Sequence, residues 1–193
     1  MLFRRFCMPP KVKTAKEDIV NAAVQIVRQS GESALNARTI AAALGCSTQP
    51  IFSNFASMEE LRLAVIAKAD ALCQAYVQRE IESAIFPAYK ASGRAYIRFA
   101  KEEKELFQLL YMRDRSAEPQ TIDSELNDKM VSLVRQNTGL ENEGAKLFHL
   151  EMWAYVHGIA AMFATGFLDL EEDLISNMLT DVYQGLRKQH NME

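Results

Sequence analysis

The segment from Ala37 to Phe52 constrains the fold more than any other part of the sequence. Its order, ARTIAAALGCSTQPIF, has the spacing of two short helices that cross steeply about a tight turn. Ala41 is small where such helices approach closely, and Gly45 stands where positive φ is most easily accommodated. Three apolar residues supply the shared contact, namely Ile40, Leu44 and Ile51. The segment is therefore predicted to be a helix-turn-helix, with a generic helical hairpin as the alternative.

The second helix of this hairpin is predicted to begin at Ser47. As N-cap, Ser47 would bind the amide of Gln49, and Pro50 would lie in the first turn, whose N–H groups lack intrahelical partners. The proline would also stiffen the end of the helix that enters a major groove. Polar side chains suited to base edges and phosphates follow, namely Thr48, Gln49, Ser53 and Asn54.

The rest of the chain has the periodicity and punctuation of helices, so the fold class is predicted to be all-α. Only eight Gly and five Pro occur in 193 residues, and turn-rich strand spacing is absent. Capping boxes are predicted at Thr14 with Glu17 and at Ser57 with Glu60. Besides the hairpin, the ranges expected to be helical are 15–30, 58–86, 92–112 with a break near 101–104, 122–136, 143–165 and 169–189.

Charge is unevenly distributed along the chain. Residues 1–68 hold nine Lys or Arg against five Asp or Glu, a net charge of +4, whereas residues 69–193 have a net charge of −7. A basic head on an acidic body is expected if only the head meets phosphate. A difference of this size also arises by chance, so it favours DNA binding only modestly.

The hairpin and its flanks resemble the N-terminal domain of TetR-family repressors. The resemblance runs from Thr14 to about Val65 and rests on the hairpin together with the segment IFSNFASMEEL from Ile51 to Leu61. A three-helix DNA-binding domain is implied. The residues that the resemblance assigns to DNA binding are Arg38, Thr39, Ser47, Thr48, Gln49, Pro50, Phe52, Ser53 and Asn54.

Three positions depart from the family's pattern. The family usually has Tyr where this chain has Phe52 and Lys where it has Met58, and both often contact phosphate. Contacts to the DNA backbone would then depend on Arg38, Thr39, Ser53, Asn54 and Lys68. Cys46 stands where the family prefers Val, and is interpreted as a core residue rather than a redox switch.

A second resemblance lies near the other end of the chain. The segment Trp153 to Gly158, WAYVHG, is similar to the Trp-His-Gly signature of one class of TetR C-terminal domains, and the segment from Phe99 to Phe107 resembles the part that precedes it. Core packing also explains these residues individually. The resemblance implies a mostly apolar ligand pocket with a few polar groups. The residues predicted to line it are Phe99, Phe107, Tyr111, Trp153, His157 and Met162.

Together the two resemblances imply a two-domain regulator. Residues 1–13 are expected to be a flexible segment, 14–56 the DNA-binding domain, and 57–193 a helical ligand-binding and dimerisation domain. In the family, the last two helices of each subunit form a four-helix dimer interface, and a two-fold dimer binds a near-palindromic operator in double-stranded DNA. A small-molecule effector would release a repressor from that operator through the long helix after Ser57, and an activator is the alternative.

Nothing in the sequence argues for an enzyme. Catalytic Ser/His/Asp arrangements, phosphate loops and paired carboxylate motifs are lacking, and no cofactor or metal is expected. His157 is interpreted as a neutral core histidine, because His149 lies two turns away and His190 is in the tail. The competing class is a helical enzyme or adaptor that keeps the hairpin as a scaffold.

Two further features bear on where the protein acts and where it starts. Three widely spaced cysteines fit a reducing cytoplasm. The apolar stretch 147–168 contains Glu151 and two histidines, which favours a buried helix over a membrane span. Met8 is hypothesised to be the biological start, the alternative being that residues 1–13 form a basic arm on DNA.

Overall fold

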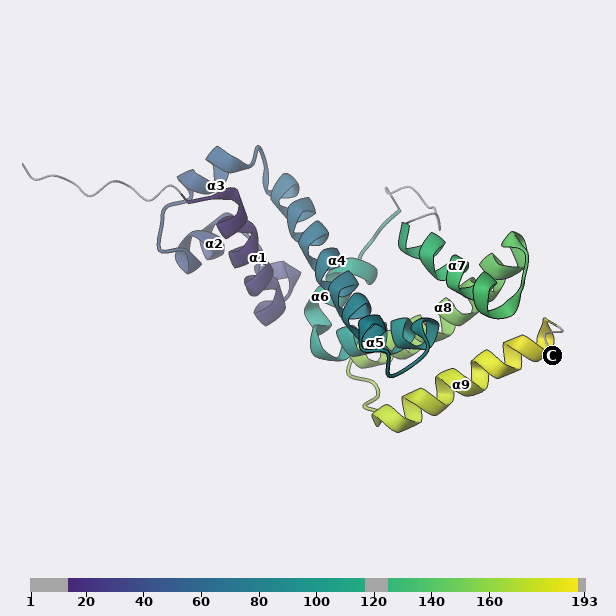
Figure 1. The fold of residues 1–193 in the computed structure, drawn as a ribbon. Coiled ribbons are helices and arrows are strands. Elements are labelled where there is room, and N and C mark those ends of the chain that lie inside the picture. The colour runs from purple at the N-terminus through teal and green to yellow at the C-terminus, as the bar shows by residue number, and fades with distance from the viewer. Residues whose placement is uncertain (1–13, 117–124, 191–193) are drawn as a thin grey trace, which may run out of the picture. The chain divides into compact units, whose positions relative to one another are not determined.

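The computed structural model describes residues 14–116 and 125–190, and over these ranges the chain is all helical (Figure 1). The N-terminal segment 1–13, and with it the choice between Met1 and Met8 as the start, lies outside the described residues. The chain divides into two compact units between Val65 and Ile66, inside helix α4 (Met58–Glu82). The boundary at residues 56 and 57 stays a prediction.

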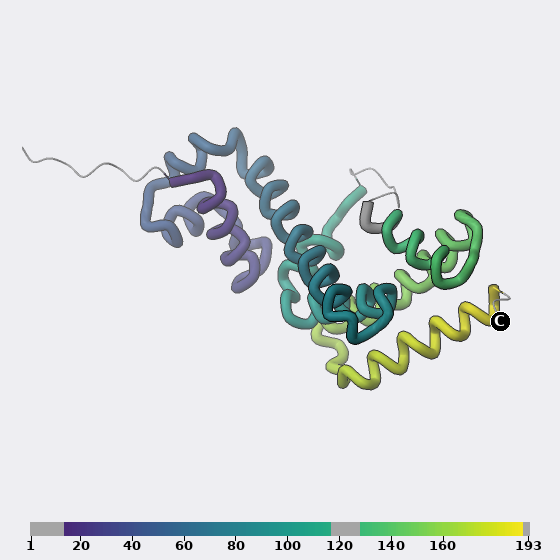
Figure 2. The backbone as a smooth tube through the Cα atoms, viewed as in Figure 1, coloured from purple at the N-terminus to yellow at the C-terminus, as the bar shows by residue number. Residues whose placement is uncertain are grey.

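The N-terminal unit contains α1 (Lys16–Ser30), the 3-10 helix η1 (Glu32–Ala34), α2 (Ala37–Ala43), α3 (Gln49–Asn54) and the start of α4. Helix α1 packs against η1, α2 and α3. The core of the N-terminal unit is formed by buried apolar side chains, among them Ile19, Ala23, Val27, Ile40, Ile51, Phe55 and Leu61. In the backbone trace of Figure 2, α1, α2 and α3 lie close together, as the helices of a helix-turn-helix domain do.

The predicted cap of α1 is wrong by one residue, and that of α4 is confirmed. The Asp18 carboxylate accepts the N–H of Ala15 at 3.2 Å, so Asp18 takes the place predicted for Glu17. At α4, Ser57 Oγ accepts the N–H of Glu60 at 3.1 Å. The N–H of Ala56 (2.7 Å) and the Lys16 ammonium (3.0 Å) both donate to Glu60 and hold the pKa of its carboxyl below the ordinary value.

The C-terminal unit contains the rest of α4, α5 (Ala88–Glu102), α6 (Lys104–Tyr111), α7 (Glu125–Thr138), α8 (Asn142–Ala164) and α9 (Glu172–Gln189). Helix α5 packs against α6, α7, α8 and α9, which places it at the centre of this unit (Figure 1). The predicted break near residues 101–104 is confirmed at Glu103. The predicted end of α4 and start of α5 are wrong: α4 ends at Glu82, and α5 begins directly after Pro87, because proline fits the start of a helix.

A buried ionic network joins α4, α5 and α9. Glu80 on α4 accepts a hydrogen bond from Arg98 Nη1 at 2.8 Å and lies 3.8 Å from Arg94 Nε. Arg94 also donates to the side chain of Glu172 at 2.8 Å and to its carbonyl at 3.3 Å, and its guanidinium lies over the Phe86 ring. Arg94 is 8% exposed and Glu80 9% exposed. Charges buried to this extent need such partners, so the network fixes the first turn of α9 against α5.

Arg94→Ala is expected to lower the free energy of unfolding by about 3 kcal/mol, because it removes one of the two partners of buried Glu80 and the anchor of α9. Urea unfolding followed by circular dichroism measures this difference. Lys146→Ala, which removes the exposed partner of Glu143, is the matched control and should change stability little. Equal losses in the two variants would contradict the role given to the buried network.

Candidate functional site

The turn between α2 and α3 forms where the sequence predicts it. Asn36 Oδ1 caps α2 by accepting the N–H groups of its second and third residues at 3.0 and 3.1 Å. After α2 the chain reverses at Gly45, whose φ is +62°, a conformation that glycine adopts without strain. Ile40 and Ile51 are both buried in the core of the unit. The helix-turn-helix is thus specified by its cap, its glycine and its apolar contact.

The prediction that Ser47 caps α3 is wrong. Helix α3 begins at Gln49, Thr48 occupies the N-cap position with φ −72° and ψ −13°, and no side chain binds the first N–H groups. Among the described residues the Ser47 hydroxyl accepts none of these N–H groups, and Thr48 has the helical dihedral angles that a capping residue normally lacks. Pro50 is the second residue of the helix, so its missing N–H falls in the first turn, as expected.

The nine residues predicted to contact DNA lie on α2, on α3 or in the turn between them. Five of them are exposed, namely Arg38, Ser47, Gln49, Phe52 and Ser53. The other four are partly buried, namely Thr39, Thr48, Pro50 and Asn54. On α3 the exposed residues Gln49, Phe52 and Ser53 share one side, because their spacing is three and four residues, whereas Ile51 faces the core. Their contact with DNA stays a prediction.

Several of these polar side chains already hydrogen-bond within the unit. The Thr39 hydroxyl donates to the carbonyl of Ala34 at 2.7 Å, and the Ser53 hydroxyl donates to the carbonyl four residues earlier at 2.9 Å. The Asn54 amide donates to the carbonyl of Pro50 at 2.8 Å. Thr39 and Asn54 therefore stabilise the hairpin itself. Within the described residues, no such bond occupies the side chains of Arg38, Ser47, Thr48 and Gln49.

The positive charge of the first 68 residues does not belong to the folded hairpin. Residues 14–68 hold five Lys or Arg and five Asp or Glu, so the excess of +4 comes entirely from residues 1–13, outside the described ranges. Lys16 pairs with Glu60, and Arg62 pairs with Glu32 and Glu59. The described head is therefore electrically balanced, and part of its positive charge is neutralised in ion pairs.

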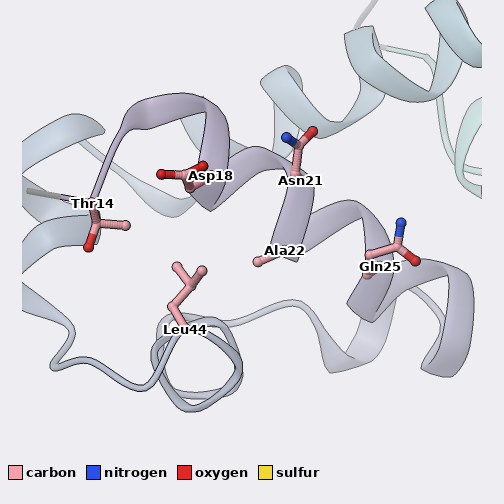
Figure 3. A pocket seen from close by; sticks show the side chains of 6 residues that line it. All are labelled: Thr14, Asp18, Asn21, Ala22, Gln25 and Leu44. Atoms are coloured by element: carbon pink, nitrogen blue, oxygen red, sulfur yellow. The ribbon is translucent and has the colours of Figure 1, made fainter. Parts of the chain in front are cut away.

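A shallow pocket of about 420 Å³ opens between α1 and the end of α2 (Figure 3). It is lined by Thr14, Asp18, Asn21, Ala22, Gln25 and Leu44. In Figure 3, Leu44 points into the pocket from α2, opposite the polar side chains of α1. A second pocket, of about 400 Å³, lies at the turn between α7 and α8. Neither pocket is lined by any of the six residues predicted to bind a ligand.

Four of those six residues belong instead to an aromatic cluster in the C-terminal unit. We define the aromatic cluster as Tyr96, Phe107, Tyr111, Trp153 and His157. The His157 ring stacks on Trp153 with centroids 5.0 Å apart and planes 20° apart, and lies 5.8 Å from Phe107 and 6.0 Å from Tyr111. Phe107 is fully buried, whereas Trp153 is 41% exposed, so the aromatic cluster extends from the core to the surface.

The other two predicted ligand residues lie outside the aromatic cluster. The Phe99 ring is fully buried and meets Tyr76 of α4 edge-on, with centroids 5.4 Å apart. Met162 is exposed on α8. Sequence reasoning left Tyr96 out of the site, although this residue contacts Phe107, Tyr111 and His157.

Two tyrosine–histidine pairs join α5 to α8. The Tyr89 hydroxyl shares a hydrogen bond with His149 Nδ1 at 3.0 Å, and the Tyr96 hydroxyl shares one with His157 Nδ1, also at 3.0 Å. The tyrosines are seven residues apart and the histidines eight, which is two helical turns on each helix. This repeat was the signal in the sequence that could have identified Tyr96.

Burial keeps all four of these side chains uncharged near neutral pH. It raises the pKa values of Tyr89 and Tyr96 and lowers those of His149 and His157, because the charged forms lose their hydration. Next to the aromatic cluster, burial raises the pKa of the Cys73 thiol to about 12, so Cys73 is not a reactive thiolate. The hydrogen bond between His157 and Tyr96 agrees with the interpretation of His157 as a neutral, hydrogen-bonded histidine, but its side chain is only partly buried.

Charging His149 should destabilise the protein as the pH falls. Its pKa is lower in the folded state than the ordinary 6.5, so the unfolded chain takes up the proton first, and the free energy of unfolding decreases below that pH. In His149→Asn, which keeps a polar group near Tyr89, the decrease between about pH 7.5 and about pH 5.5 is expected to be smaller than in the wild type. Urea unfolding at both pH values measures this decrease in the free energy of unfolding. An equal decrease in the variant and the wild type would contradict the lowered pKa of His149.

Among the described residues, no group of three or more His, Cys, Asp or Glu side chains is placed to hold a metal ion. No helix in the described part of the chain has the length and apolar character needed to cross a bilayer.

Comparison with known proteins identifies the C-terminal unit. Residues 89–182 match the family described as "Tetracyclin repressor-like, C-terminal domain". This span contains both tyrosine–histidine pairs and the whole aromatic cluster. Assignment to the Trp-His-Gly class within that family stays a prediction. No protein of curated function matches the sequence.

Solved structures share the fold over nearly the whole chain. A TetR-like transcriptional regulator from Rhodococcus sp. RHA1 has a TM-score of 0.67 at 16% identity, covering 95% of this chain and 98% of its own. A TetR family member from Streptomyces coelicolor A3 has a TM-score of 0.60 at 18% identity, covering 86% and 96%. The multidrug binding protein EbrR, complexed with imidazole, has a TM-score of 0.61 at 19% identity, covering 94% and 96%.

Proposed function

We propose that the chain is a transcriptional regulator of the TetR family, a homodimeric repressor that a small molecule releases from operator DNA. The observation that carries the proposal is the exposed side of α3, where Gln49 and Phe52 face outward while Ile51 is buried in the core. Helix α3 is the second helix of the helix-turn-helix, the one that reads base edges in the major groove. An enzyme is not proposed.

Selection from a random library of double-stranded DNA tests the proposal directly. A sequence-specific regulator should enrich a near-palindromic site, because a two-fold dimer presents two copies of α3. Gel shifts with the enriched duplex at two salt concentrations then compare specific with non-specific binding. Failure to enrich any sequence with the full-length, folded protein would overturn the proposed function in favour of an adaptor or another helical protein.

Gln49→Ala is expected to weaken binding to the enriched duplex by about 1–3 kcal/mol, because a Gln amide can make two hydrogen bonds to adenine in the major groove. Binding to random duplex should change much less. The side chain of Gln49 is exposed and unbonded within the described residues, so the fold should be unaffected. An equal loss on both duplexes would show that Gln49 contacts the DNA backbone instead.

The dimer is proposed to form through α8 and α9. Small and apolar residues of α8 recur at spacings of three and four on one exposed or partly exposed side, namely Leu147, Leu150, Ala154 and Gly158. Leu174 of α9 is also exposed, at 47%. A side chain added at Gly158 would meet no atom within 4 Å, so this part of α8 is open in a single subunit. Small residues there allow close approach of a second copy.

Gly158→Glu should convert the dimer to monomer without unfolding it. Glutamate favours a helix more than glycine does and meets open space in the single subunit, but it would place two charges in an apolar interface. Light scattering coupled to size-exclusion chromatography measures the mass. Ala71→Glu, on an exposed site of α4, is the matched control and should remain dimeric. A dimeric Gly158→Glu variant would exclude this side of α8 from the interface.

The aromatic cluster is proposed as the site where the effector acts, together with Phe99 and Met162. Planar rings, two tyrosine hydroxyls and an imidazole suit a mostly apolar ligand with few polar groups. EbrR, a multidrug binding protein of similar fold solved with imidazole, supports this proposal by analogy. Trp153 is the one tryptophan in the chain, so its fluorescence reports binding of any test compound to the aromatic cluster. Release from DNA requires that the compound bind the free form more tightly.

A further inference from the structure

Phe52 is an exposed aromatic side chain on the side of α3 that carries Gln49. Its exposed fraction is 54%, whereas the neighbouring Ile51 and the following Phe55 are each 1% exposed. The packing of the head therefore does not account for an aromatic ring at this position. Unlike a tyrosine, Phe52 has no hydroxyl and cannot hydrogen-bond to a phosphate or to a base edge.

The rest of the described head offers few groups for contacts to the DNA backbone. Residues 14–68 have no net charge, and Lys16 and Arg62 are engaged in ion pairs. The side chains of Thr39 and Asn54 bond to carbonyls within the unit. Besides the exposed Arg38, few cationic side chains of the described head are therefore left for the DNA backbone, so apolar and hydrogen-bonded contacts to bases are expected to contribute to its affinity.

In the major groove, the one apolar group on a base edge is the C5-methyl of thymine. We propose that Phe52 packs on this methyl group and selects thymine at one position of each half-site. Gln49 lies three residues earlier, about 4.5 Å along the helix axis, which is comparable with the spacing of successive base pairs. Phe52 and Gln49 would accordingly read neighbouring base steps. This inference rests on the proposed binding of operator DNA by α3.

Replacing thymine by uracil removes only the methyl group and tests the inference in the enriched duplex. Uracil is placed at one thymine position at a time, symmetrically in both half-sites, and the dissociation constant of the full-length protein is measured. At the position read by Phe52, the wild type should lose about fourfold in affinity per half-site, the effect of one methyl group removed from an apolar contact. Phe52→Ala should bind the thymine and uracil duplexes equally at that position.

Two further variants make the result specific to this side chain. Leu63→Ala truncates an apolar residue that is also 54% exposed, on α4, and should keep the full preference for thymine. Phe52→Leu keeps an apolar group on α3 and should keep part of that preference. Circular dichroism verifies that each variant is folded. We expect all of them to fold, because Phe52 and Leu63 are both exposed.

The outcomes separate this inference from the proposed function. A position at which only the wild type, Leu63→Ala and Phe52→Leu discriminate thymine from uracil supports the role of Phe52. If the wild type binds the enriched duplex but shows the same uracil effects as Phe52→Ala at every position, the inference is overturned and operator binding stands. If no duplex is enriched, the proposed function and the inference are both overturned.

Discussion

The C-terminal unit depends on the packing of α5, which contacts α6, α7, α8 and α9. A helix surrounded in this way must bury residues on most of its circumference, and the buried residues of α5 include three alanines besides larger side chains such as Tyr96 and Phe99. A side chain built on Gly93 would already touch Val156 of α8 and Leu179 of α9. Close packing of this kind tolerates few changes in side-chain volume.

Central burial also forces α5 to pair its polar groups with its neighbours. Tyr89 and Tyr96 bond to histidines of α8, and Arg94 bonds to Glu172 of α9. An unpaired polar group at these depths would cost more than its hydrogen bond contributes, so each pair restricts how α8 or α9 can dock. The Tyr96 pair also belongs to the aromatic cluster, so a ligand that separated these rings would have to replace that hydrogen bond.

Local features could be predicted from the sequence, and distant partners could not. The Ser57 cap, the turn at Gly45 and the break near residue 103 depend on interactions within a few residues, and they could be predicted. The error at Ser47 concerns a single position, where several nearby polar residues could cap the helix, whereas the predicted end of α4 and start of α5 are each four residues from the observed bounds. By contrast, Glu172 is 78 residues from Arg94, and only the tertiary packing of α9 on α5 brings them together. Phe99 was assigned to the ligand site from the family resemblance, and its edge-on contact with Tyr76 of α4 is likewise a tertiary contact that the sequence does not show.

The charge of the N-terminal residues is another property whose meaning depends on tertiary contacts that the sequence does not show. The excess of nine basic over five acidic residues favours phosphate binding when residues 1–68 are counted together. Four of the nine precede residue 14, and in the described head Lys16 and Arg62 form ion pairs with carboxylates on neighbouring elements. A basic side chain that holds two elements together is less available to replace counterions on DNA. Under the proposed function, the described head would therefore depend for its contacts with DNA on the side chains that α2 and α3 leave exposed, such as Arg38 and Gln49.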